Sequence, residues 1–185
     1  MKRPSVLGLA LVACASVTVA APPEANTQRP AFPSKLVILD VELSGDLGGP
    51  EVAPEHEARL ILASAKLRES LSHTGLYQLV DSTPAQSTIG ELKSRYLYLH
   101  DCNGCDLDIG RQLGADQVLV AWVNRVSALI LSLTYEFHDV ATGQITARKS
   151  FGFRGDNDAS WRRAIDYMVR DLDESATTRG GETEP

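Results

Sequence analysis

The feature that most constrains the fold of this chain is a late segment, residues 129–138, in which apolar and polar side chains alternate. A period of two residues is typical of a strand with one buried face. An apolar run at 118–123 precedes this segment, and an Ala141-Thr142-Gly143 turn leads from it into residues 144–154, where apolar residues again share a face. Three strands in succession indicate an antiparallel meander. They exclude a doubly wound nucleotide fold, in which strands and helices alternate to the end.

Ahead of this meander, strands and helices alternate. Short apolar runs bounded by turn residues predict strands over residues 35–43 and 76–80. A long helix is predicted from Pro54, which suits the first helical position, to Gly75, which suits the residue after the last turn.

Three further helices are predicted over residues 87–98, 107–113 and 158–172. The last one has an apolar side formed by Trp161, Ile165, Met168 and Leu172. We therefore expect Trp161 to pack against the sheet and not to contact a partner. The order of elements predicts an α/β (α+β-like) sandwich, in which helices pack on a mixed sheet with an antiparallel C-terminal meander.

The start of the chain has the pattern of an export signal. Two basic residues are followed by an apolar run from Val6 to Ala21, which Pro22 closes. The run is shorter than the ~20 residues that a membrane-spanning helix needs. It predicts a signal peptide over residues 1–20, cleaved after Ala20.

A competing signal lies inside the same run, because Leu11-Val12-Ala13-Cys14 resembles the bacterial lipobox, whose cysteine is lipidated. Simple cleavage is favoured, since the apolar stretch continues past Cys14 to Ala21, which a lipid tether does not require. Both routes carry the protein out of the cytoplasm. The predicted location is the periplasm, with an outer-membrane lipoprotein as the alternative, and membrane contact is expected only if Cys14 is lipidated.

The two ends of the chain differ in composition from its middle. The proline-rich residues 21–34 predict an extended linker, and the small polar residues 175–185 predict a disordered tail. A single α/β domain is expected over residues 35–174. The net charge of −6 argues against nucleic-acid binding, because a phosphate-backbone binder needs a basic surface.

Cys102-Asn103-Gly104-Cys105 is the sharpest local motif. Asp106 follows where covalent haem attachment needs a histidine, so no haem is predicted. Acidic neighbours oppose a thiolate, which weakens a redox role, and a metal site would need two more ligands, such as His100 and an Asp. We interpret Cys102 and Cys105 as a structural disulfide. A thiol-disulfide or metal-dependent redox factor built on the pair remains the alternative.

A second polar cluster, Arg154-Gly155-Asp156-Asn157-Asp158, lies where the last strand meets the last helix. The favoured interpretation is a helix cap formed by Asp156 or Asp158, with Arg154 paired locally. The acidic residues are adjacent and lack the alternate spacing of a calcium-binding loop, so no metal site is predicted. Arg154, Asp156, Asn157 and Asp158 also form the candidate binding loop. The scattered histidines and the lack of a phosphate-binding glycine loop predict no catalytic residues and no cofactor.

Several short motifs together resemble known bacterial proteins. Val80-Asp81, Leu113-Gly114-Ala115-Asp116 and Asp139-Val140-Ala141-Thr142-Gly143 are similar to the N-terminal domain of TolB and the periplasmic domain of the curli secretion lipoprotein CsgG. The Cys-x-x-Cys pair and the Arg154–Trp161 stretch resemble an uncharacterised family of small secreted bacterial proteins (DUF2380/DUF3280-like). The resemblance covers residues 35–174 and implies the fold of these domains and a binding or assembly role in the envelope. It also associates the family with periplasmic quinoprotein dehydrogenase systems.

These observations predict a non-enzymatic periplasmic binding or accessory module of the bacterial envelope. Its partner would be another periplasmic or envelope protein, contacted through an exposed sheet edge or the loops near Arg154. The alternatives are the redox factor built on Cys102 and Cys105, and an outer-membrane assembly lipoprotein anchored at Cys14.

Overall fold

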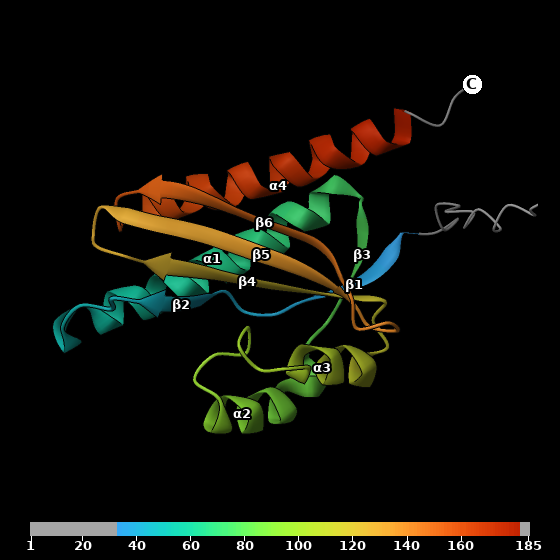
Figure 1. Ribbon diagram of the computed structural model, residues 1–185, viewed down its shortest axis with the longest axis horizontal. Coiled ribbons are helices and arrows are strands. Elements are labelled where there is room, and N and C mark those ends of the chain that lie inside the picture. The colour runs from blue at the N-terminus through green and yellow to red at the C-terminus, as the bar shows by residue number, and fades with distance from the viewer. Residues whose placement is uncertain (1–32, 182–185) are drawn as a thin grey trace, which may run out of the picture.

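The computed structural model describes residues 33–181, so the predicted signal peptide and Cys14 lie outside the described residues. Figure 1 shows a twisted sheet with helices on both faces. The strands are β1 (Ser34–Ile38), β2 (Glu42–Gly45), β3 (Tyr77–Val80), β4 (Gln117–Arg125), β5 (Ile130–Asp139) and β6 (Ile145–Arg154). The helices are α1 (Ala53–Thr74), α2 (Gln86–Arg95), α3 (Cys105–Leu113) and α4 (Asp158–Gly181), with single turns at Pro50–Val52 and Thr83–Ala85.

The sheet is mixed, as the sequence predicts. Its strand order is β3-β1-β4-β5-β6, and β2 also pairs with β4 beyond the end of β1. β1, β2, β3 and β4 run parallel to one another, whereas β4, β5 and β6 form an antiparallel meander. This arrangement confirms the α/β sandwich.

Each face of the sheet has its own apolar core. α1 and α4 pack side by side on one face, where the larger cluster contains Leu67, Phe137, Ile165 and Met168. α2 and α3 cover the opposite face near β1 and β4, with a smaller cluster around Val37, Ile109 and Val118. Trp161 is 3% exposed and belongs to the larger core, which confirms the prediction from the apolar side of the last helix.

The strand predicted over residues 35–43 is divided in two. β1 ends at Ile38, opposite Leu119 of β4, and β2 begins at Glu42, opposite Trp122. The first segment therefore uses one residue more than β4 between these two pairings, which is the geometry of a bulge. Periodicity did not predict the break, because residues 36–39 are apolar on both faces; Asp40 and Glu42 were the sign that the buried face changes.

Because of the extra residue, odd-numbered residues after the break point to the face that even-numbered residues occupy before it. The N–H of Val41 donates to Ser64 Oγ of α1 at 2.9 Å instead of to a neighbouring strand. The larger core contains alternate residues from before and after the break, namely Leu36, Ile38, Val41 and Leu43. Glu42 consequently lies on the opposite side, beside the segment that precedes α3.

The helix ends differ from the predictions at three places. α1 ends as expected at Thr74, followed by Gly75 with φ of +67°. α2 ends at Arg95, three residues before the predicted boundary, because Tyr96 is already extended. α3 begins at Cys105 and includes the second cysteine. α4 continues to Gly181, so the predicted tail from residue 175 begins as helix.

Candidate binding site at the sheet edge

β6 forms one edge of the sheet. It pairs with β5 along its length, and no other described strand lies beside it. Phe151 and Phe153 point toward α4 and are half-buried, while the residues between and beside them are exposed. The outer side of a ten-residue strand is thus available for pairing with another chain.

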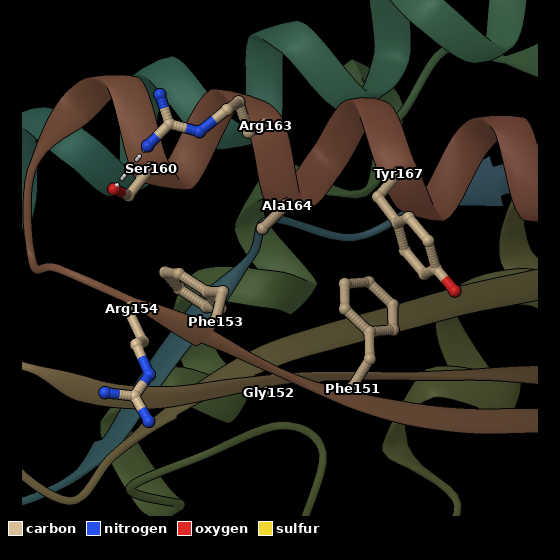
Figure 2. A pocket seen from close by; sticks show the side chains of 8 residues that line it. All are labelled: Phe151, Gly152, Phe153, Arg154, Ser160, Arg163, Ala164 and Tyr167. Carbon is tan, nitrogen blue, oxygen red and sulfur yellow. Dashed lines mark hydrogen bonds between the residues drawn. The ribbon is translucent and has the colours of Figure 1, made fainter.

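A groove of about 460 Å³ runs between β6 and α4. We call it the β6 groove. Figure 2 shows Phe151 and Phe153 rising from the strand and Tyr167 reaching down from the helix, while Arg154 points to the other side of the strand. The Phe151 and Tyr167 rings pack edge to face, with centroids 4.9 Å apart. Arg163 closes one end and donates to Ser160 Oγ at 2.9 Å.

The edge is basic although the chain is acidic. β6 carries three cations and no carboxylate. Arg148 pairs with Glu136 at 3.1 Å and Lys149 with Asp171 at 2.6 Å, and the hydrogen bond to Asp171 raises the pKa of Lys149. Arg154 is exposed and has no ion-pair partner among the described residues. The apolar groove therefore lies beside positively charged side chains.

The end of β6 is fixed by a buried carboxylate. The Asp156 side chain is 6% exposed and accepts four hydrogen bonds. Oδ1 accepts from Arg59 at 3.1 Å and from Trp161 Nε1 at 3.1 Å. Oδ2 accepts from Arg125 Nε at 2.8 Å and lies 2.9 Å from His56 Nε2. We call these five residues the Asp156 cluster. Asp156 lies in the connection between β6 and α4, and the other four members come from α1, the end of β4 and the start of α4.

The cluster lowers the pKa of Asp156. Burial alone would raise the pKa of this carboxyl. Hydrogen bonds from His56, Arg125 and Trp161, together with the nearby Arg59 charge, outweigh burial and hold the pKa below its usual value. The carboxylate is thus ionised and acts as an acceptor only.

The predicted binding loop is divided by these contacts. Asn157, and neither Asp156 nor Asp158, caps α4, with its Oδ1 accepting from Ser160 N at 3.1 Å. Asp158 is exposed and lies 3.4 Å from Arg59. The prediction that Arg154 forms a local pair is wrong. The arginines that contact Asp156 are Arg59 and Arg125, which come from elsewhere in the chain. Only Arg154 and Asp158 of the four predicted residues point their charge toward solvent.

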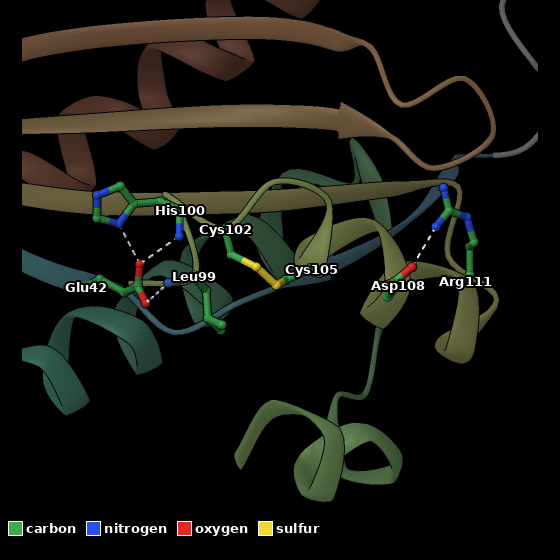
Figure 3. Close-up of a disulfide and its surroundings, with 7 residues drawn as sticks. All are labelled: Glu42, Leu99, His100, Cys102, Cys105, Asp108 and Arg111. Carbon is green, nitrogen blue, oxygen red and sulfur yellow. Dashed lines mark hydrogen bonds and ion pairs between the residues drawn. A yellow bond between two sulfur atoms is a disulfide. The ribbon is translucent and has the colours of Figure 1, made fainter. Parts of the chain in front are cut away.

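The two cysteines form the expected disulfide. Cys102 and Cys105 are bonded, with Cα atoms 5.6 Å apart, and both are buried (Figure 3). Gly104, with φ of +92°, provides the turn that brings Cys105 to the first position of α3. The bond uses both sulfur atoms, so the pair has no free thiol for a metal. Within residues 33–181 no group of three or more His, Cys, Asp or Glu side chains could hold a metal ion.

His100, a candidate metal ligand, has another role. Its Nδ1 lies 2.6 Å from Glu42 Oε2, and its ring stacks between Tyr98 and Trp122 (Figure 3 shows the His100–Glu42 contact). Burial would raise the pKa of Glu42, but the hydrogen bonds from His100 and from the Leu99 N–H outweigh burial and hold the pKa below its usual value. Fifty-eight residues separate Glu42 from His100, and no local pattern signals this pair.

The fold and the free edge define an α/β sandwich with an open strand beside an apolar groove. The chain belongs to the family described as Protein of unknown function (DUF2380), whose model matches residues 34–172. This confirms the family membership expected from the motifs. No curated protein matches the chain. No helix among the described residues is both long and apolar enough to cross a membrane.

Several solved structures are similar to this chain. The C-terminal domain of LpoB from Escherichia coli is 20% identical, with 64% of this chain and 81% of that chain covered and a TM-score of 0.47. A lipoprotein from Neisseria meningitidis is 15% identical, with 82% and 100% covered and a TM-score of 0.45. TolB from Acinetobacter baumannii is 12% identical, with 82% and 30% covered and a TM-score of 0.43. The expected likeness was to the N-terminal domain of TolB, and this match covers 30% of that chain.

Proposed function

We propose that this protein is a non-enzymatic accessory module of the bacterial envelope that binds an extended segment of another envelope protein along β6. The observation that carries the proposal is the free outer side of β6 next to the β6 groove. Backbone groups of an added strand pair with the edge, and its alternate side chains enter the groove.

Charge defines the kind of segment that fits. Arg154 and Arg163 are exposed at one end of β6 and of the groove, and the strand itself carries no carboxylate. Phe151, Phe153 and Tyr167 offer apolar surface between them. The bound segment therefore combines apolar side chains on one face with acidic side chains near its end. The family resemblance makes a periplasmic quinoprotein dehydrogenase the first partner to examine.

A photo-crosslinking amino acid in place of Ser150, an exposed residue of β6, tests the proposal in envelope preparations. The same amino acid in place of Ser94, exposed on α2, is the reference position. We expect one discrete envelope protein to be captured from position 150 only.

Intact mass of the exported protein also decides between a chain that begins at Ala21 and one lipidated on Cys14.

Two neighbouring arginines of α4 provide the matched pair of variants. Arg163 lines the β6 groove, whereas Arg162 lies on another side of the same helix, near Arg59. Arg163→Glu should abolish the adduct at position 150, and Arg162→Glu should leave it. Equal adducts from positions 150 and 94, or no effect of Arg163→Glu, would contradict binding at this edge.

A further inference from the structure

A glycine lies in the interior of the free strand β6. Gly152 stands between Phe151 and Phe153, whose side chains point toward α4, so a side chain at position 152 would point to the opposite, outer face of the sheet. Glycine weakens a strand interior, because it has no side chain to pack and loses more conformational entropy on folding. Such a glycine often marks the close approach of a ligand or of another backbone.

Nothing in the described part of the chain requires a glycine at this position. The φ angle of Gly152 lies outside the left-handed region, unlike that of Gly155. Apart from its chain neighbours, a Cβ atom on Gly152 would meet only the carbonyl oxygen of Leu131, at 3.8 Å, which is an ordinary contact. The residue opposite Gly152 on β5 is Ser132, which is also small. The backbone is therefore open to an approaching group on the outer face.

The N–H and C=O groups of Gly152 point to the free side of β6. On the other side of β5, the Val126 N–H donates to the Ile130 carbonyl at 3.0 Å, and these residues are directly opposite when the β4–β5 register is continued. Hydrogen-bonded and non-hydrogen-bonded pairs alternate along an antiparallel ladder, so Ser132 also directs its backbone groups toward β4. Gly152 and Ser132 are then a non-hydrogen-bonded pair. Both backbone groups of Gly152 are available to an added strand.

A cation lies beside the open position. Arg154 follows Gly152 by two residues, and its side chain lies on the side of the strand opposite the two phenylalanines (Figure 2). Arg154 is exposed and has no ion-pair partner within residues 33–181. A guanidinium group attracts the face of an aromatic ring. β6 carries three cations and no carboxylate, so a second copy of this chain paired along the same strand would bring like charges together.

We propose that the segment bound along β6 belongs to another protein and places an aromatic side chain opposite Gly152, on the outer face of the sheet and beside Arg154. The inference rests on the proposed function of β6, to which it adds a register and a recognition residue. An aromatic side chain opposite a glycine covers the backbone that the glycine leaves exposed and offsets the weakness of the strand there. The side chains before and after the aromatic residue then point to the β6 groove.

Two peptides with blocked ends test the proposal. One is Thr-Glu-Val-Trp-Val-Thr-Glu-Thr, and the other has alanine in place of tryptophan. With the central residue opposite Gly152 in an antiparallel pairing, the valines face the β6 groove and a glutamate lies opposite Arg154. Binding to the whole exported protein is measured by titration calorimetry and by changes in amide NMR signals. We expect both peptides to shift signals of residues 145–154, with the tryptophan peptide bound about 3- to 30-fold more tightly.

Variants separate the glycine from the rest of the edge. Gly152→Gln fills the position with a neutral side chain, and should remove the preference for tryptophan while the alanine peptide still binds. Gly90→Ala is the control, because Gly90 is exposed on α2 and its added Cβ would meet no atom within 4 Å. This variant should keep the full preference. Arg154→Gln should reduce the preference, and decides with the wild type if Gly152→Gln does not fold.

The outcomes distinguish this inference from edge pairing itself. Equal binding of the two peptides at β6, or a preference that Gly152→Gln leaves unchanged, would overturn the aromatic register and leave pairing at the edge intact. Binding of neither peptide, or shifts away from β6, would overturn the inference and count against the proposed function as well. A dimer of the free protein in analytical ultracentrifugation that the peptides dissociate would identify a second copy as the occupant, and would also overturn the inference.

Discussion

The parallel and antiparallel halves of the sheet are covered differently. β1 and β4 lie between two helical layers, and most of their residues are buried. β6 has a helix near one face only, and none of its ten residues is fully buried. The comparison shows that β6 need not serve the same purpose as the strands inside the sheet. The doubly covered strands and β5 supply the core, whereas β6 leaves its backbone and several side chains available for binding.

The largest expected loss of stability is at α4, which has one side in the core and another at the β6 groove. Trp161 is buried, and Trp161→Ala should lower the free energy of unfolding by about 3–5 kcal/mol. Tyr167, 45% exposed on the groove side, is the control. Tyr167→Ala should cost far less stability and should weaken partner capture. Similar losses in urea denaturation for both variants would remove the distinction between the two sides of the helix.

A smaller effect is expected where the two halves meet, at Asp156. Asp156→Asn keeps the shape but removes the charge that accepts from two arginines and a histidine, and should cost about 1.5–3 kcal/mol near neutral pH. The pKa of Asp156 is lowered on folding, so its contribution is complete above the usual carboxyl value of 3.8 and is lost as pH falls through the lowered pKa. Urea denaturation at a series of pH values is the measurement. The difference between wild type and variant should shrink in acid, and a constant difference would contradict the ionised cluster.

The smallest effect is expected at the disulfide, far from the β6 edge. Cys102 and Cys105 are separated by three positions, and closing so short a loop stabilises the fold by less than about 2 kcal/mol. Replacing both by serine should lower stability within that limit and leave partner capture at β6 unchanged. Loss of partner capture, or reductase activity of the wild type, would favour the alternative redox role.

Local patterns predicted the elements better than the contacts between them. The alternation in residues 129–138 identified β5, and the apolar side of the last helix placed Trp161, because each signal lies within one element. The parallel order β3-β1-β4 was not predicted, since pairing of separated strands leaves no periodic trace. The bulge between β1 and β2 was not predicted either, because it depends on the register of both strands with β4.

The candidate sites show the same limit. The sequence indicated the segment from Arg154 to Asp158 and the possible use of a sheet edge. It did not indicate that Asp156 would be buried, because Arg59 is 97 residues away and His56 is 100 residues away. Arg125, at the end of a very apolar strand, was the one local sign of a buried partner. The β6 groove needed α4 in place before Tyr167 and Arg163 could be recognised as its walls.

The Asp156 cluster also has a mechanical consequence. Immediately after β6, the N–H groups of Gly155 and Asp156 donate to Leu129 and Ala128 of the neighbouring hairpin, and the Asp156 side chain joins that point to α1 and β4. A bound segment that pulls along β6 would therefore load the hairpin, α1 and β4 together and would not peel the strand from its end. Force on the binding edge would be shared with the doubly covered half of the sheet.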